Sequence, residues 1–221
     1  ETVYGCIDEL ATNHNPEANW NDGSCTYPDN GDYSLSFDGE DDWVYIGKPL
    51  GMNPHGDHSF MFWIKNNKSS CDGQGQIISD YNELPENYKH LNLAYGGCQS
   101  NFYGINCPNG NCLVYNFYDD GIVTDASSVN QDEYTHWAIT YDSTTLDRNI
   151  FKNGNLVAQN LSNSNYVGNL ELILGVEHNS NNEFVWDSAL NAMFSNFSVW
   201  SKVLNETEIQ NYYTNNPSGL E

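Results

Sequence analysis

The polar segment at residues 175–187 carries the side chains of this sequence that are best suited to bind a ligand. It follows an apolar run that begins at Leu170, and it gathers carboxylate and amide groups in one loop. These groups belong to Glu177, Asn179, Asn181, Asn182, Glu183 and Asp187. Calcium is a hard cation, so it prefers oxygen ligands of this kind. The segment therefore indicates a Ca²⁺ site, and a polar loop that holds no ion is the alternative.

Paired carboxylates of the kind that hydrolyse glycosides are not found on any predicted strand. A retaining glycosidase needs two carboxyl groups about 5–5.5 Å apart, which one strand supplies from alternate residues on the same face. Glu171 stands alone on its strand, and Asp132 and Glu133 precede theirs. The sequence also lacks Gly-x-Ser-x-Gly and His-Glu-x-x-His. We therefore expect no catalytic residues and no enzymatic activity.

Aromatic side chains in loops or at strand ends form a second class of candidate binding residue, because aromatic rings stack on sugar rings. The residues predicted to bind a ligand in this way are Tyr81, Tyr95, Tyr103 and Trp186. For each of them, packing inside a loop is the alternative. The tryptophans predicted to lie in the core are Trp43, Trp63, Trp137 and Trp200.

The net charge of −23, with only seven lysines and arginines, excludes some classes of partner. Nucleic acids and anionic membrane surfaces are not expected, because binding phosphates requires clustered cations. A surface adapted to a salty medium, which screens the repulsion, explains the acidity. Carboxylates that collect Ca²⁺ are a compatible explanation. No stretch approaches the roughly 18 apolar residues of a membrane span, so no membrane insertion is expected.

The six cysteines predict three disulfides and an oxidising, extracellular compartment. Cys6 and Cys25 bracket a segment without apolar alternation, which needs a crosslink to be ordered, so we expect a Cys6–Cys25 disulfide. Counting strand reversals places the other four at one end of the domain; they are Cys71, Cys98, Cys107 and Cys112. A tight loop from Cys107 to Cys112 would leave Cys71 with Cys98, and the other pairings stay open.

The segment Gly5–Cys25 resembles a short motif of secreted, multidomain microbial proteins, with Gly-Cys-x-Asp at its start and Asp-Gly-Ser-Cys at its end. The resemblance implies an extracellular spacer or cap, and a parent protein that is larger. The side chains that could hold an ion there are Asp8, Asn13, Asn15 and Asp22, and a disulfide-closed loop without an ion is the alternative. The expected domains are an appendage at 1–30, a β domain at 31–216 and a tail at 217–221 that could be a cloning remnant.

Short strands separated by turns account for most of the β domain. Tyr33–Phe37 alternates in polarity, an acidic turn follows at Asp38–Asp42, and Trp43–Ile46 is the next strand. Ser59–Ile64 is an apolar run typical of a buried central strand. Within Tyr134–Gly154, an alternating strand and a polar turn lead to Asn153-Gly154, a pair that favours a type I′ hairpin turn.

A single helix is expected near the end, because Asn205 and Glu208 have the spacing of a capping box. The predicted fold is therefore all-β: a two-sheet antiparallel jelly-roll sandwich with one short C-terminal helix.

These elements together resemble the laminin-G-like and pentraxin-like branch of the concanavalin A-like jelly rolls. The resemblance is carried by the strand and hairpin at Tyr134–Gly154, by the Phe-Asp-Gly that ends at Gly39, and by Gly-x-Glu-x-Asx from Gly175. A strand that ends at Trp200 and is followed by Val-Leu-x-x-x-Glu-Ile completes it. It departs at Trp63 and Ala138, where pentraxins have their core disulfide.

The pentraxin resemblance also implies a set of calcium ligands. In that family the glutamate of Gly-x-Glu-x-Asx and the residue two positions later bind Ca²⁺, which gives Glu177 and Asn179 here. A distal ligand falls near Asp187 or Ser188. Pentraxins have a second pair of calcium ligands, an adjacent carboxylate and amide in the loop after an early strand. The corresponding residues here are Glu86 and Asn87.

The expected function is calcium-dependent binding of a glycan or glycoconjugate on a cell surface or in a matrix. The protein would be secreted or displayed on a cell surface, and the bound glycan could serve cell adhesion. A structural or adhesive module of a larger surface or virion protein, without sugar binding, is the alternative. A glycoside hydrolase ranks third.

Overall fold

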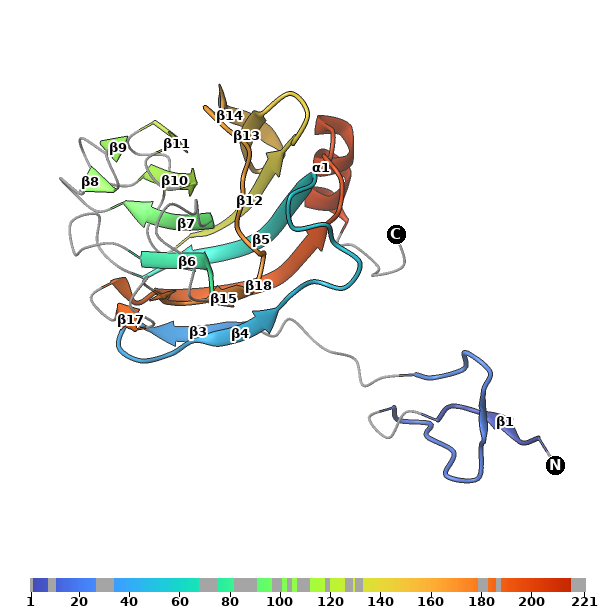
Figure 1. Cartoon of the computed structure of the whole chain (residues 1–221). Coiled ribbons are helices and arrows are strands. Elements are labelled where there is room, and N and C mark those ends of the chain that lie inside the picture. The colour runs from blue at the N-terminus through green and yellow to red at the C-terminus, as the bar shows by residue number, and fades with distance from the viewer. Residues whose placement is uncertain are drawn as a thin grey trace. The chain divides into compact units, whose positions relative to one another are not determined.

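The computed structural model in Figure 1 describes thirteen stretches of the chain. They are residues 2–7, 11–26, 34–67, 75–81, 91–96, 101–102, 105–106, 112–117, 120–125, 129, 133–178, 183–185 and 188–215. The chain divides into two compact units, residues 1–33 and 34–221. The boundary therefore falls at residue 33, whereas the sequence suggested residue 30.

The first unit is held by a disulfide and by hydrogen bonds from asparagine side chains. Cys6 and Cys25 form the predicted disulfide, which confirms that pairing. Strand β1 (Tyr4–Gly5) pairs in parallel with β2 (Trp20–Asn21). The Asn13 side chain donates to the Ser24 carbonyl at 2.6 Å and accepts from the Thr26 backbone amide at 2.7 Å. The disulfide and polar hydrogen bonds thus stabilise this unit, in the role that a hydrophobic core has in a larger one.

The second unit is a sandwich of two six-stranded antiparallel sheets, which confirms the predicted fold (Figure 1). The first sheet has the order β11-β10-β7-β6-β15-β4. Its strands are β11 (Gly121–Val123), β10 (Cys112–Phe117), β7 (Leu91–Gly96), β6 (Gly75–Asp80), β15 (Leu172–Leu174) and β4 (Val44–Gly47).

The second sheet has the order β14-β13-β12-β5-β18-β3. Its strands are β14 (Asn155–Leu161), β13 (Asp147–Lys152), β12 (Tyr134–Tyr141), β5 (His58–Asn66), β18 (Asn191–Trp200) and β3 (Leu35–Asp38). Two short hairpins complete the strands: β8 (Asn101–Phe102) with β9 (Ile105–Asn106), and β16 (Glu177–His178) with β17 (Phe184–Val185). At the predicted hairpin turn, Asn153 and Gly154 both have positive φ, at 50° and 78°, as a type I′ turn requires.

The main core lies between the two sheets and is built from alternate residues of the central strands. Trp137 of β12 is fully buried there, as predicted. Trp63 and Trp200 are instead partly buried against aromatic side chains of the helix, with ring centroids 5.5 Å from Tyr213 and 5.3 Å from Tyr212, respectively.

Trp43 is a correction to the predicted core. It is 40% exposed and directly precedes β4, whose residues Val44 and Ile46 pack against the core. The period of two along a strand places Trp43 on the opposite face from these two residues.

The helix α1 (Glu206–Thr214) covers the outer face of the second sheet (Figure 1). Its capping box is confirmed: the Asn205 side chain accepts from the Glu208 backbone amide, and the Glu208 carboxylate accepts from the Asn205 amide. Ile209 is fully buried beside Met61 and Ala138. Within the described residues, no helix is long and apolar enough to cross a membrane.

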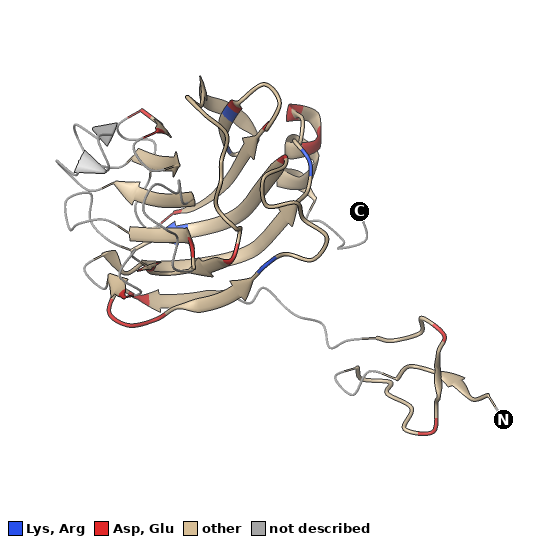
Figure 2. Ribbon diagram, viewed as in Figure 1, with Lys and Arg blue, Asp and Glu red and all other residues tan. Residues whose placement is uncertain are grey.

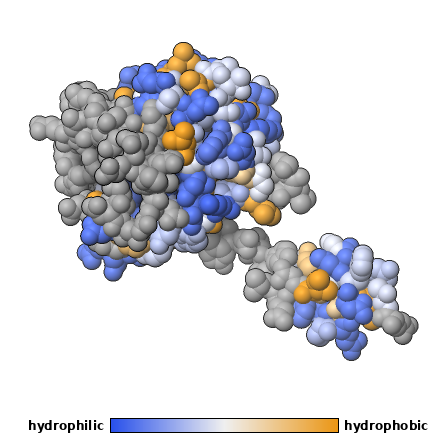
Figure 3. Space-filling view, in the orientation of Figure 1, coloured by the Kyte–Doolittle hydropathy of each residue, from blue (hydrophilic) through white to orange (hydrophobic). Residues whose placement is uncertain are grey.

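On the face seen in Figure 3 the described surface is mainly hydrophilic, and basic residues are few in the described part of the chain (Figure 2). The only arginine of the chain, Arg148, is fully buried, so its charge does not contribute to that surface.

Candidate functional site

Tyr81 and His178 lie side by side, and each is the last described residue before a stretch, outside the described residues, that contains predicted calcium ligands. The backbone amide of Tyr81, the residue after β6, donates to the Glu171 carbonyl. The Tyr81 ring lies 4.6 Å from the His178 ring of β16, centroid to centroid. The Ser79 hydroxyl of β6 also donates to the Val176 carbonyl at 3.1 Å. The segment that contains Glu86 and Asn87 follows Tyr81 in the sequence and lies outside the described residues.

Of the five predicted calcium ligands, Glu177 is the one that the structure describes. Its backbone pairs with Val185 in the β16–β17 hairpin, and its side chain is nearly buried. Four predicted ligands lie outside the described residues: Glu86, Asn87, Asn179 and Asp187. A carboxylate at the base of this hairpin is a suitable oxygen donor for Ca²⁺.

The acidic turn between β3 and β4 is a second group of oxygen donors. The carboxylate oxygens of Asp38, Asp41 and Asp42 lie within 4.8 Å of one another. Figure 2 shows this acidic turn beside β17. Two of the carboxylates also order the turn itself, since Asp42 accepts from the Asp38 backbone amide at 3.0 Å and Asp38 accepts from the Glu40 amide at 2.8 Å. Hydrogen bonds within the turn therefore explain part of this cluster without an ion.

An aromatic cluster surrounds Tyr81 and reaches the surface at two residues that were not among the predicted ligand-binding residues. The ring of Trp43 is nearly parallel to that of Tyr81, at 7° and 6.4 Å between centroids. Tyr45 meets Tyr81 edge-on at 5.3 Å, and Phe184 of β17 lies 4.8 Å from Trp43. Trp43 and Tyr45 are 40% and 50% exposed. Tyr81 is thus the half-buried centre of the cluster, and these two residues provide its solvent-facing rings.

A charged pair borders the aromatic cluster. The Tyr45 hydroxyl donates to the Glu171 carboxylate, and this hydrogen bond raises the pKa of Tyr45 above its usual value. The other carboxylate oxygen of Glu171 lies 3.9 Å from the Lys48 ammonium, whose side chain is largely exposed. Glu171, which the sequence placed alone on its strand, therefore joins a tyrosine and a lysine at the rim of the cluster.

Tyr95 is a correction to the predicted ligand-binding residues. It lies in β7, is only 5% exposed and belongs to the core between the sheets. Burial raises its pKa above the usual value for tyrosine. Its position follows from the period of the strand, because Leu91, Leu93 and Tyr95 all face the core. Tyr103 and Trp186, and likewise Cys71, Cys98 and Cys107, lie outside the described residues.

Trp43 and Tyr45 could have been found from the sequence by the same rule. Val44 and Ile46 are the apolar alternation of β4, so their neighbours on either side must face away from the core. The partnership between Tyr45 and Glu171 has no such local signal, since the two residues are 126 positions apart.

Asp80, the last residue of β6, is a buried carboxyl group next to the aromatic cluster. Its Oδ2 accepts from the Tyr166 hydroxyl at 2.5 Å and from the Leu91 backbone amide at 2.9 Å. Within the described residues, its Oδ1 has no hydrogen-bond partner. Burial raises the pKa of Asp80 to about 7, although both hydrogen bonds act in the opposite direction. This group is therefore largely protonated in mildly acidic solution.

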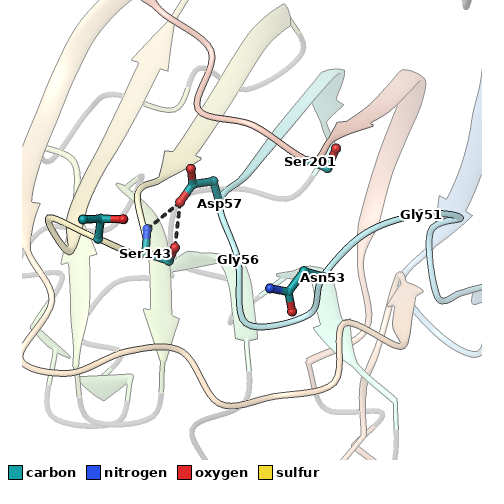
Figure 4. Close-up of a pocket in the computed structure, with 7 residues that line it drawn as sticks. Gly51, Asn53, Gly56, Asp57, Ser143 and Ser201 are labelled. Carbon is teal, nitrogen blue, oxygen red and sulfur yellow. Dashed lines mark hydrogen bonds between the residues drawn. The ribbon is translucent and has the colours of Figure 1, made fainter.

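A polar pocket of about 370 Å³ lies elsewhere on the second unit, where β5 begins and β12 and β18 end (Figure 4). Asp57, before β5, is hydrogen-bonded to Ser143, after β12. Its Oδ1 accepts from the backbone amide of Ser143 at 2.9 Å and from the hydroxyl of Ser143 at 2.7 Å. The described lining consists of small and polar residues: Gly51, Asn53, Gly56, Asp57, Ser143, Thr144 and Ser201. The aromatic cluster is the better candidate for binding sugars, because aromatic rings provide most of the contact area for a sugar ring.

Comparison with protein families gives one match, and it covers most of the chain. Residues 38–210 match a family described as the concanavalin A-like lectin/glucanases superfamily, of the laminin-G type. A search of curated proteins gave no match.

Solved structures show the same fold at low sequence identity. The native heptameric SAP-like pentraxin of Limulus polyphemus has a TM-score of 0.56 and 11% identity, covering 84% of this chain and 83% of the pentraxin. A candidate carbohydrate-binding protein of Bacteroides ovatus has a TM-score of 0.59 and 17% identity, over 80% of this chain and 45% of that one.

The ligand-binding domain of botulinum neurotoxin serotype D, in complex with N-acetylneuraminic acid, is a third similar structure. It has a TM-score of 0.54 and 15% identity, over 83% of this chain and 42% of the toxin chain. This chain thus spans less than half the length of the second and third proteins. At these identities the likeness concerns the fold alone.

Proposed function

Because this chain belongs to the concanavalin A-like lectin/glucanase superfamily, we propose that its second unit is a calcium-dependent, lectin-like domain. It binds a glycan on a cell surface or in a matrix, at the edge of the sandwich where Tyr81 meets β16. The protein acts outside the cell, either secreted or displayed on a surface, and the bound glycan serves adhesion.

The contact between Tyr81 and His178 is the observation that carries this proposal. It joins the starts of two segments that are about a hundred positions apart in the sequence, and each contains carboxylate and amide donors. A cation that takes six to eight oxygen ligands needs donors from more than one segment. In the proposed site, Glu177 and Asn179 bind Ca²⁺ from one segment, Glu86 and Asn87 bind it from the other, and Asp187 is the distal ligand.

Calcium has two roles in such a site. A bound Ca²⁺ would neutralise the repulsion among the carboxylates that hold it. It would also attract sugar hydroxyl groups, which are oxygen ligands. The residues of this chain supply the ion's position and orient the sugar beside it.

Disulfides support the proposed extracellular location. Cys6 is bonded to Cys25, and Cys112 is also in a disulfide. Disulfides of this kind persist in oxidising environments and are rare in the cytosol.

The experiment that tests the proposal is binding to a glycan array, with the whole chain, in the presence of Ca²⁺ and then of EDTA. We expect binding to a restricted set of glycans in Ca²⁺ and loss of that binding in EDTA. Even in Ca²⁺, Glu177→Ala should show the loss of binding that EDTA causes in the wild type. The control Glu206→Ala removes an exposed carboxylate from α1, and in Ca²⁺ it should bind as strongly as the wild type. Binding that persists in EDTA would refute the calcium dependence, and binding to no glycan would favour the adhesive module without sugar recognition.

A further inference from the structure

We propose that Trp43 and Tyr45 form the platform on which a neutral sugar ring of the ligand stacks, with Glu171 and Lys48 at its rim. This inference rests on the proposed glycan-binding function and names the class of sugar and the residues that hold it.

Tyr45 lies in strand β4, and Trp43 directly precedes that strand. Val44 and Ile46 of β4 pack against the core, and this packing fixes the backbone between them. Trp43 and Tyr45 therefore point away from the core, and both rings remain substantially exposed. Exposed large aromatic side chains that gather at one place mark binding surfaces more often than single ones do.

Contacts with neighbouring side chains hold the rings of Trp43 and Tyr45 in place without a ligand. Tyr81 lies nearly parallel to Trp43 and edge-on to Tyr45. Phe184 supports Trp43 from β17, with 4.8 Å between the ring centroids and 41° between the planes. The hydrogen bond from the Tyr45 hydroxyl to Glu171 fixes the second ring. Rigid groups of this kind lose little conformational entropy on binding.

The rim supplies both kinds of hydrogen-bonding group that a sugar needs. The Glu171 carboxylate is an acceptor for hydroxyl groups, and the Lys48 ammonium, 3.9 Å from it, is a donor. A hydroxyl-rich ring stacked on Trp43 and Tyr45 would present its equatorial hydroxyl groups to this rim. The arrangement combines an apolar surface with a few polar groups at its border, as small-molecule sites do.

Charge favours a neutral sugar over an acidic one. The carboxylates of Asp38, Asp41 and Asp42 lie in the turn directly before Trp43. The chain carries a net charge of −23, and its single arginine is buried in an ion pair with Asp120. Lys48 is already paired with Glu171. A carboxylated sugar would therefore be repelled at this platform, whereas a neutral hexose would not.

The test uses arrays of neutral oligosaccharides and of sialylated ones, probed in Ca²⁺ and in EDTA. Trp43→Ala and Tyr45→Ala should each weaken binding to neutral glycans by about tenfold or more, as expected for aromatic anchors. Tyr45→Phe keeps the ring and loses the bond to Glu171, so it should bind better than Tyr45→Ala. Two matched controls remove exposed aromatic rings elsewhere: Trp20→Ala, from a residue 62% exposed, and Tyr134→Ala, from one 46% exposed. Both should stay within about twofold of the wild type.

The results distinguish this inference from the proposed function. If Glu177→Ala abolishes binding while Trp43→Ala and Tyr45→Ala bind like the wild type, the platform is wrong and the calcium-dependent function stands. If binding survives EDTA but is lost in both platform variants, the platform stands and the calcium dependence is wrong. Stronger binding to sialylated glycans than to neutral ones, or a change in oligomeric state in Trp43→Ala, overturns the inference. The absence of any glycan binding by the wild type overturns both.

Thermal unfolding of each variant shows whether it folds. Should the alanine variants unfold, Trp43→Phe provides a second measurement. The glycan should change the tryptophan fluorescence of the wild type, and Trp43→Phe should remove that change while keeping a stacking ring. An identical fluorescence change in both proteins contradicts the proposal.

Discussion

The guanidinium group of Arg148 lies 2.9 Å from the Asp120 carboxylate, and both side chains are buried. Arg148 also donates to the Asp120 carbonyl, and it lies over the Phe117 ring at 5.2 Å. Asp120 in turn accepts from the Ser162 hydroxyl at 2.8 Å and from the Asn163 amide at 2.7 Å. Because Arg148 is in β13 and Asp120 directly precedes β11, the pair connects the two sheets of the sandwich.

Breaking this pair should destabilise the protein strongly. In Asp120→Asn the arginine charge remains buried without its counterion, and we expect a loss of about 3–5 kcal/mol in the free energy of unfolding. Urea unfolding at pH 7 measures it. The matched control is Lys202→Ala, which breaks the exposed pair of Lys202 and Glu208 and should cost less than about 1 kcal/mol. Equal losses in the two variants would contradict the inter-sheet role of Arg148.

Asp80 should make the stability of the protein fall as pH rises. Its pKa is about 7 in the folded protein and near the ordinary value of 3.8 in the unfolded chain. At a pH below both pKa values, Asp80 is protonated in the folded and in the unfolded protein. Between them the unfolded state releases a proton that the folded state retains, so the free energy of unfolding decreases by about 1.4 kcal/mol per pH unit, and it levels off above pH 7.

Asp80→Asn tests that dependence, because the amide keeps an oxygen that can accept from Tyr166 and Leu91. We expect a flatter profile between pH 5 and pH 8 and a variant that is more stable than the wild type at pH 8. Urea unfolding across this range, in EDTA to exclude effects of calcium, provides the measurement. Asp41→Asn is the control, because Asp41 is exposed. A wild-type slope that survives in Asp80→Asn would mean that another group causes it.

Local patterns predicted much of the fold. The alternation in Tyr134–Tyr141 and the Asn153-Gly154 turn define the central hairpin, and the spacing of Asn205 and Glu208 defines the start of the helix. Each of these signals involves residues near one another in the sequence, where period and capping chemistry act directly.

The surroundings of the candidate site could not be predicted in the same way. A large apolar ring is usually buried, which predicts Trp43 in the core, yet its neighbour Val44 begins β4 facing the core and leaves Trp43 on the opposite side. Tyr95 was expected at the surface because it ends a strand, and the parity of β7 places it inside. The contacts of Tyr81 with Trp43 and His178 depend on how distant strands pack, which no local pattern encodes.

The protein should not hydrolyse glycosides. The carboxylate of Glu171 is bonded to Tyr45 and lies near Lys48, an arrangement suited to holding a sugar. Hydrolysis would require a second carboxylate about 5–10 Å away, positioned for acid or base catalysis. Incubation with laminarin, agarose and related β-glycans should release no reducing sugar. Release that disappears in Glu171→Gln or Glu177→Gln would show that the domain is an enzyme.

Calcium should raise the melting temperature. An ion that binds only the folded state stabilises it by RT ln(1 + [L]/Kd), which is roughly 2.7 kcal/mol at a hundredfold excess over Kd. For a chain of this length that corresponds to a shift of roughly 5–10 °C. We expect the melting temperature to fall in EDTA and to recover with Ca²⁺ more than with Mg²⁺, because Mg²⁺ demands a smaller and stricter octahedral site.

Variants of single carboxylates locate the ion that causes this shift. Glu177→Ala and Glu86→Ala should each lose most of the calcium-induced increase, whatever their melting temperature in EDTA. Glu206→Ala, on the helix, should keep all of it, which excludes a general effect of surface charge. Asp41→Asn probes the acidic turn, where Asp41 lies with Asp38 and Asp42. If Glu177→Ala and Glu86→Ala both keep the full increase while Asp41→Asn loses it, the ion binds in the turn between β3 and β4, and the site at the β16–β17 hairpin is wrong.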